Sequence, residues 1–214
     1  MPGGGDQRSA AVGRLLDHVE ARRHLTQALD LYVQRLDQVG QADTHRSFTV
    51  LSEQQGHLGQ ALYHAAQALA GYRAAEHLRG QAVALNAVGW CQALFGDHAA
   101  ALPHCEQALA LFTKLDDRDG EAHTADSLGY TYHLLGQHAR ATSWYQQAVA
   151  LFRALADRYS EARVLASLGD AHAAGGSAGA AEAAWREALD LLVDLDHPDA
   201  EGVRAKLRAP VFGP

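Results

Sequence analysis

Residues 121–160 read EAHTADSLGYTYHLLGQHARATSWYQQAVALFRALADRYS, and elements of this pattern return every 40 residues along the chain. The spacing is kept by three columns of small residues: Gly89, Gly129 and Gly169; Gly56, Gly96, Gly136 and Gly176; and Ala61, Ala101, Ala141 and Ala181. Self-similarity at a fixed period of this size is typical of repeat architectures. The sequence therefore predicts an array of four units, 41–80, 81–120, 121–160 and 161–198.

Each unit is predicted to be a helical hairpin. In unit 121–160 a first helix, helix A, is expected over about 121–134 and a second, helix B, over about 138–156. Gly136 lies between them, where glycine can adopt the left-handed conformation that ends a helix. Gly129 and Ala141 are expected where the two helices approach most closely, and residues 115–120 are expected to link one hairpin to the next. One hairpin cannot bury its apolar face alone, so the units must stack.

Composition supports an all-α fold. Of the 214 residues, 43 are Ala and none is Ile, while Val and Thr are sparse, which disfavours β-sheet. Pro103 is the only proline between Pro2 and Pro198, so long stretches are free to be helical. A local irregularity is expected in the helix that contains Pro103, because proline lacks the backbone N–H.

Charge and cysteine content limit the function classes. The net charge of −7 argues against direct nucleic-acid binding, which needs a clustered basic surface. No apolar run is long enough for a membrane helix, and the N-terminus lacks the pattern of a secretion signal, so we expect no membrane association and a cytoplasmic location. Cys91 and Cys105 are too few for a disulfide framework and are expected to be buried, reduced thiols.

The unit resembles the tetratricopeptide repeat (TPR). The residues that carry the resemblance are Leu128, Gly129, Tyr132, Gly136, Ala141, Tyr145 and Ala148, and again Leu168, Gly169, Gly176, Ala181, Trp185 and Ala188. The resemblance implies a right-handed α-solenoid whose helices A line the concave surface, where TPR domains bind ligands and peptides. The period of 40 exceeds the usual value of about 34, and the longer-helix variety of the family places the additional residues in helix B and the linker.

The ends of the array depart from the pattern. Unit 41–80 is a degenerate repeat, because Thr49 replaces the glycine of helix A and Gly71 replaces a leucine. Residues 9–40 are expected to form a partial N-terminal hairpin behind a disordered leader at 1–8. Residues 199–208 are expected to form a capping helix before a tail at 209–214, since a solenoid needs a covered end.

Several segments are also similar to the C-terminal repeat region of actinobacterial transcriptional regulators of the SARP/AfsR type. They are ALNAVGW at 84–90, LPHCEQAL at 102–109, DSLGY at 126–130, DHPDAE at 196–201 and the entry segment RLLDH at 14–18. In that family a DNA-binding domain, an activation domain and an NB-ARC nucleotide-binding switch precede the repeats. The resemblance implies a sensor module for signal transduction, which binds a partner or the NB-ARC or DNA-binding region of its own regulator. The alternative is a free-standing scaffold or adaptor that links two proteins.

The resemblance implies that equivalent positions of helix A in each repeat face the concave surface, and these positions hold the candidate partner-binding residues. They are Arg46, Val50, Asn86, Trp90, His123, Asp126, Tyr130, His133, Arg163 and Asp170, with Asp43, Glu53 and Val83 beside them. Trp90 and Tyr130 are the expected anchors, since such aromatics contribute most of the binding energy at many interfaces. The alternative is that both only pack against neighbouring helices.

Catalytic, metal and cofactor sites are not predicted. His123, Asp126, Tyr130 and His133 share one helical stripe, but a closed metal site needs three or four converging ligands. Residues 175–179 (GGSAG) fit an inter-helix turn better than a phosphate-binding loop. No nucleophile has an evident base and orienting group, so we expect no enzymatic activity.

Overall fold

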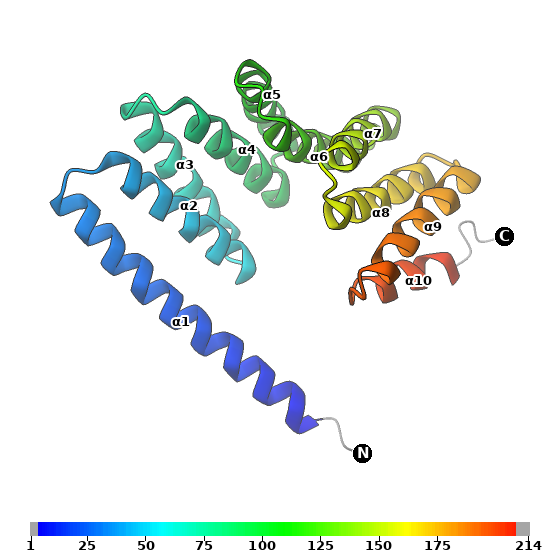
Figure 1. Ribbon diagram of the computed structural model, residues 1–214, viewed down its shortest axis with the longest axis horizontal. Coiled ribbons are helices and arrows are strands. Elements are labelled where there is room, and N and C mark those ends of the chain that lie inside the picture. Colours follow the sequence, from blue (N-terminus) through cyan, green and yellow to red (C-terminus); the bar gives the residue numbers. More distant parts are fainter. Residues whose placement is uncertain (1–3, 209–214) are drawn as a thin grey trace.

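The computed structural model describes residues 4–208, and their side chains from residue 17 onward. Within that range the chain is helical throughout, without strands. The ten helices are α1 (Gly4–Gln34), α2 (Gln38–Gln54), α3 (Leu58–Ala74), α4 (Leu78–Phe95), α5 (His98–Lys114), α6 (Arg118–Leu134), α7 (His138–Ala154), α8 (Arg158–Ala174), α9 (Ala178–Asp194) and α10 (Ala200–Arg208). Consecutive helices pack antiparallel in an open arch, which confirms the predicted α-solenoid (Figure 1).

The repeat length follows from the helices and turns. In unit 121–160 each helix has 17 residues, and three-residue turns join them. The added residues therefore lengthen both helices, and the linker predicted at 115–120 is only residues 115–117. Helix α6 begins at Arg118 because the Asp117 side chain accepts a hydrogen bond from the backbone N–H of Gly120. This N-cap satisfies a donor that the first turn would otherwise leave free.

Small residues allow close packing within each hairpin. A Cβ on Gly129 would lie 2.7 Å from the Tyr145 ring, and one on Gly89 would lie 3.0 Å from the backbone oxygen of Ala101. Gly136, as predicted, adopts a positive φ of 71° in the turn. The buried core formed by the C-terminal repeats includes Leu128, Tyr145, Phe152 and Trp185.

The N-terminal end differs from the prediction. Instead of a partial hairpin over 9–40, the structure has one helix, α1, which extends well past the end of α2 (Figure 1). The helix already includes residues 4–8, which were expected to belong to a disordered leader; residues 1–3 lie outside the described range. None of the described side chains of α1 is fully buried, because most of its contacts are with α2 on one side.

The C-terminal end follows the prediction closely. Helix α10 packs on α9 and covers the last hairpin with the buried side chains of Ala200 and Val203. It begins at Ala200, one residue later than expected, and the predicted tail at 209–214 lies outside the described residues. Helix α5 includes Pro103 and is not interrupted there, so the irregularity expected at Pro103 does not end the helix.

Candidate functional site

The inner surface of the arch is formed by the A helices of the four units, α2, α4, α6 and α8 (Figure 1). Adjacent A helices contact one another, α4 with α6 and α6 with α8, so their exposed stripes form one continuous surface. We refer to this surface as the concave groove. Residues three and four positions apart on a helix share a face, which brings the predicted candidates from separate repeats to the same side.

Seven of the ten predicted partner-binding residues line one cavity of about 550 Å³ in the concave groove. These seven are Arg46, Val50, Asn86, Trp90, His123, Asp126 and Arg163. Thr49, Glu53, Val83, Ala87 and Ser127 complete the lining. We call it the apolar cavity, because Val50, Val83, Ala87 and Trp90 supply much of its wall. Its volume lies in the range of known ligand pockets.

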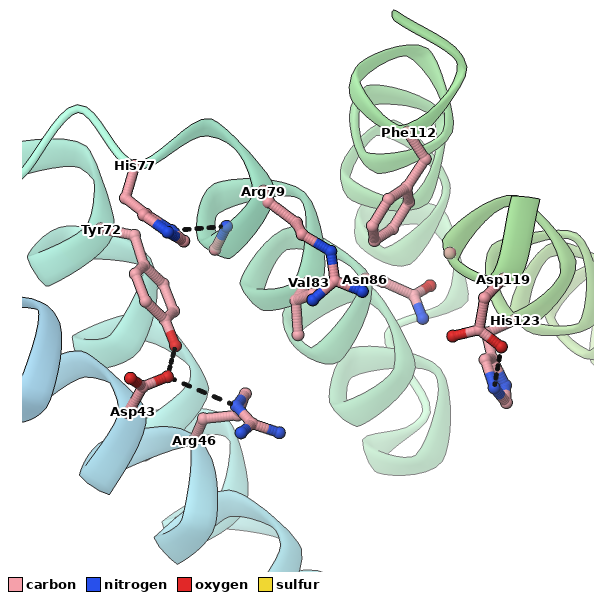
Figure 2. Close-up of a pocket in the computed structure, with 12 residues that line it drawn as sticks. Asp43, Arg46, Tyr72, His77, Arg79, Val83, Asn86, Phe112, Asp119 and His123 are labelled. Atoms are coloured by element: carbon pink, nitrogen blue, oxygen red, sulfur yellow. Dashed lines mark hydrogen bonds and ion pairs between the residues drawn. The ribbon is translucent and has the colours of Figure 1, made fainter. Parts of the chain in front are cut away.

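A second cavity of about 370 Å³ adjoins the first, and Figure 2 shows the residues that line it. The two cavities share Arg46, Val83, Asn86 and His123. The second, which we call the polar cavity, is also lined by Asp43, Tyr72, His77, Arg79, Gly80, Phe112, Asp119 and Gly120. Apart from Asp43, these additional residues lie at the ends of helices B, in the turn after α3 or in the first turn of the next helix A, outside the stripe of helix A positions used for the prediction.

Tyr72 fixes the carboxylate of Asp43 at the edge of the polar cavity. The Tyr72 hydroxyl donates a 2.6 Å hydrogen bond to Oδ1 of Asp43 (Figure 2). Burial and this hydrogen bond raise the pKa of Tyr72 to about 12. The Arg46 guanidinium approaches the same oxygen only to 3.9 Å, and the Arg46 side chain is 48% exposed. Arg46 is therefore held loosely and faces the shared space of the two cavities.

Two other basic residues of the groove are tightly paired. Arg163 donates a 2.7 Å hydrogen bond to Asp126, a carboxylate that is only 6% exposed. Arg79 donates through Nε to Asp117 at 2.7 Å. Both pairs join one repeat to the next. They stabilise the arrangement of the A helices, because a buried carboxylate such as Asp126 needs a partner.

Trp90 and Tyr130 lie against each other across the boundary between two repeats. Their ring centroids are 4.9 Å apart and the rings are tilted by 42°. Both side chains are half-buried, and only Trp90 lines the apolar cavity. Tyr130 thus supports Trp90 from the adjacent repeat. The contact shows that the two rings pack on each other, and their role as anchors for a partner stays a prediction.

Of the ten candidates, Tyr130, His133 and Asp170 lie outside both cavities. Asp170 is occupied by intramolecular partners: Lys206 of α10 forms an ion pair with it, and the Trp185 indole donates a 3.1 Å hydrogen bond to it. His133 packs against His138 with ring centroids 5.3 Å apart. Burial lowers the pKa of His133, which favours its neutral form. These residues hold the C-terminal end of the groove together.

The cysteines are buried, as predicted. The Cys91 thiol donates to Glu53 at 3.2 Å, and Cys105 packs against Gly89. Burial raises the pKa of both thiols, that of Cys105 to about 12, so neither is a reactive thiolate at neutral pH. Burial also raises the pKa of Glu53.

Among the described side chains, no group of three or more His, Cys, Asp and Glu residues converges to hold a metal ion. In the same range, no helix is both long and apolar enough to cross a bilayer.

Comparison with protein families supports the repeat assignment. Residues 80–154 match the tetratricopeptide repeat family. A comparison with curated protein sequences finds no significant match.

Solved structures with the same architecture share little sequence with this chain. BtubC (BKLC) from P. vanneervenii is 21% identical, with a TM-score of 0.65, over 98% of this chain and 78% of that protein. A Rap protein complexed with competence and sporulation factor is 17% identical, with a TM-score of 0.78, over 94% of this chain. The chain spans 56% of the length of that Rap protein. A structure of the TPR-like repeats of a putative kinesin light chain from Podosopora anserina, repeats described as nearly identical, was also found. It is 16% identical to this chain, with a TM-score of 0.63, over 86% of this chain and 96% of that one. These similarities establish a TPR-like fold.

Proposed function

We propose that the chain is a non-catalytic protein-interaction module whose concave groove binds a segment of a partner protein. The observation that carries the proposal is that side chains from α2, α4, α6 and α8 converge on two adjoining cavities. Such a site depends on the stacked repeats, because no single hairpin supplies its walls. The Rap structure, which holds competence and sporulation factor, supports the proposal as a case of binding by a similar fold.

We further propose that the module serves as the effector domain of a transcriptional regulator similar to the SARP/AfsR type. The support is the sequence resemblance of residues 84–90, 102–109, 126–130 and 196–201. In this role the groove would bind a partner or the switch domain of the same regulator, and binding would shift the population between closed and open forms. Capture of two different proteins in one complex would instead favour the alternative role as an adaptor.

The proposal is tested by replacing the aromatic pair of the groove. The intact chain, immobilised through its C-terminus, is used to capture proteins from a lysate of its source, and these are identified by mass spectrometry. Trp90→Ala combined with Tyr130→Ala should remove the captured partner, because truncation of an aromatic anchor costs about 2 kcal/mol or more.

The matched control is Tyr63→Ala. Tyr63 is an exposed aromatic on helix B α3, 58% exposed and outside both cavities. The Tyr63→Ala variant should capture the partner as well as the parent chain does. Circular dichroism must show that both variants keep the helical fold. Equal capture by the double variant and the parent chain would refute binding in the groove.

A further inference from the structure

Arg46 stands out among the charged side chains of the groove, because it is the basic residue there without a close acidic partner. Arg79, Arg163 and Lys206 are each paired with a carboxylate within hydrogen-bonding distance. The nearest carboxylate to Arg46 is that of Asp43, at 3.9 Å, and its Oδ1 already accepts the 2.6 Å bond from Tyr72. A guanidinium carries five N–H donors, so Arg46 retains unused donors.

The position of Arg46 decides what those donors can reach. Arg46 lines both the polar and the apolar cavity, on the α2 side, together with Asn86 of α4 (Figure 2). On the neighbouring turns of the same surface lie Val50, 48% exposed, and the wall formed by Val83, Ala87 and Trp90. A ligand at this junction would meet an unsatisfied cation beside apolar surface.

The two acidic groups of the apolar cavity each have an intramolecular hydrogen-bond donor. Asp126 accepts from Arg163, and Glu53 accepts from the Cys91 thiol. The polar cavity holds two exposed carboxylates, Asp43 with its single bond from Tyr72 and Asp119 on the far wall, 3.6 Å from His123. At the junction of the two cavities, Arg46 therefore presents N–H donors that no carboxylate within hydrogen-bonding distance occupies.

We propose that the groove selects a peptide segment in which an acidic side chain lies next to an apolar side chain, with the carboxylate bound by Arg46 and the apolar group seated against Val50 and Trp90. This inference rests on the proposed function and specifies its partner. Charge-assisted hydrogen bonds from a guanidinium to a carboxylate are short and directional. Because the chain carries a net charge of −7, long-range electrostatics disfavour acidic peptides in general. Selection must therefore come from the local contact.

The test uses a library of N-acetylated, C-amidated hexapeptides, whose blocked ends leave side chains as the only charges. Peptides retained by the intact chain are identified by mass spectrometry, and their affinities are measured by fluorescence anisotropy. Retained peptides should contain Asp or Glu beside a large apolar residue. Replacing that acid by its amide in the peptide should weaken binding at least tenfold.

Variants of Arg46 assign this preference to one side chain. Arg46→Gln should remove the tenfold difference between the acid and amide peptides, and Arg46→Glu should reverse the preference towards peptides with Lys. The control is Arg73→Gln, because Arg73 is an exposed arginine of α3 outside both cavities. This variant should keep both the difference between acid and amide peptides and the preference for acidic over Lys peptides.

The outcomes separate the two proposals. Peptides that depend on Trp90 but show no acid preference, or a preference that survives Arg46→Gln, would overturn the inference about Arg46 and leave groove binding intact. Failure of every peptide class to bind, with the fold confirmed by circular dichroism, would overturn both. A preference for basic peptides in the parent chain would also contradict the inference.

Discussion

His45 and His64 form a polar contact inside the hairpin α2–α3. Their Nδ1 atoms are 3.0 Å apart, and Phe48 stacks on His64 with ring centroids 4.8 Å apart. One ring must donate and the other accept, so at least one of them is neutral. In the three following repeats the same columns hold Leu85 with His104, Ala125 with Trp144, and Leu165 with Ala184. The first full repeat is thus the one with a titratable pair at this position.

This pair predicts that acid weakens the N-terminal repeat. Burial, with the nearby charges of His45 and Arg22, lowers the pKa of His64 from its ordinary 6.5 to about 4. Between these values the unfolded chain binds more protons than the folded chain, so stability falls as the pH drops from 6.5 towards 4. Melting temperatures measured by circular dichroism at pH 7 and pH 5 should show a smaller acid-induced decrease in His64→Gln than in the parent chain. Equal decreases would contradict this prediction.

Single residues also show what the sequence could predict. The glycine and alanine columns were expected at close helix contacts, and Gly129 does face the Tyr145 ring. The pairing of His45 with His64 was not predicted, because it depends on rotamers at an interface between two helices. Asp170 was predicted as a partner-binding residue, and nothing in the sequence indicated its ion pair with Lys206, which depends on how α10 packs on the last hairpin.

The boundaries of the helices are set by their caps. Asp37, Asp117 and Asp157 each accept a hydrogen bond from the backbone N–H three residues on, at the start of α2, α6 and α8. Apolar periodicity placed the start of α6 at about residue 121, whereas the cap places it at Arg118. The capping residue Asp117 and Gly120 are visible in the sequence, but apolar periodicity does not detect a cap.

Asp117 allows a direct test of this capping. Asp117→Ala removes the bond to the Gly120 N–H and the ion pair with Arg79, which links this turn to the preceding repeat. The loss of an N-cap costs about 0.5–2 kcal/mol, so the midpoint of urea unfolding should decrease. Asp116→Asn is the control, because Asp116 is 89% exposed, has only a 3.6 Å contact with Arg118, and lies at a positive φ of 52° that Asn also adopts readily. Equal unfolding midpoints for the two variants would show that the cap does not stabilise α6.

The array as a whole is expected to differ in stability from end to end. The described side chains of α1 are all at least partly exposed, and unit 41–80 contains Thr49 in place of glycine and the His45–His64 contact. The C-terminal units have continuous apolar packing and are covered by α10. Local opening should therefore begin at the N-terminal end. Hydrogen exchange should be faster over residues 17–50 than over 120–170, and the opposite order would contradict this grading.

The fold was largely predictable because one period governs the chain, and the groove was predictable to the extent that it follows helix A columns. Those columns placed Arg46, Asn86, Trp90 and Asp126 correctly in the groove lining. They could not predict which residues line the polar cavity, because this cavity forms only where neighbouring repeats meet. The residues missed are Tyr72, His77, Arg79, Phe112 and Asp119. The curvature of the stack determines that contact, and it depends on side-chain packing across several units.

Site-specific photocrosslinking is the measurement that tests groove binding most directly. A benzophenone amino acid is introduced at Val50, an exposed position in the apolar cavity, and in a second variant at Tyr63 on helix α3. Each intact variant is irradiated in a lysate of its source, and crosslinked peptides are sequenced by mass spectrometry. Our account predicts that Val50 crosslinks one recurrent partner segment, that Tyr63 does not, and that Trp90→Ala abolishes the product. Crosslinking of the same segment from Tyr63 but not from Val50 would contradict it, because the partner would then bind the outer face of the arch.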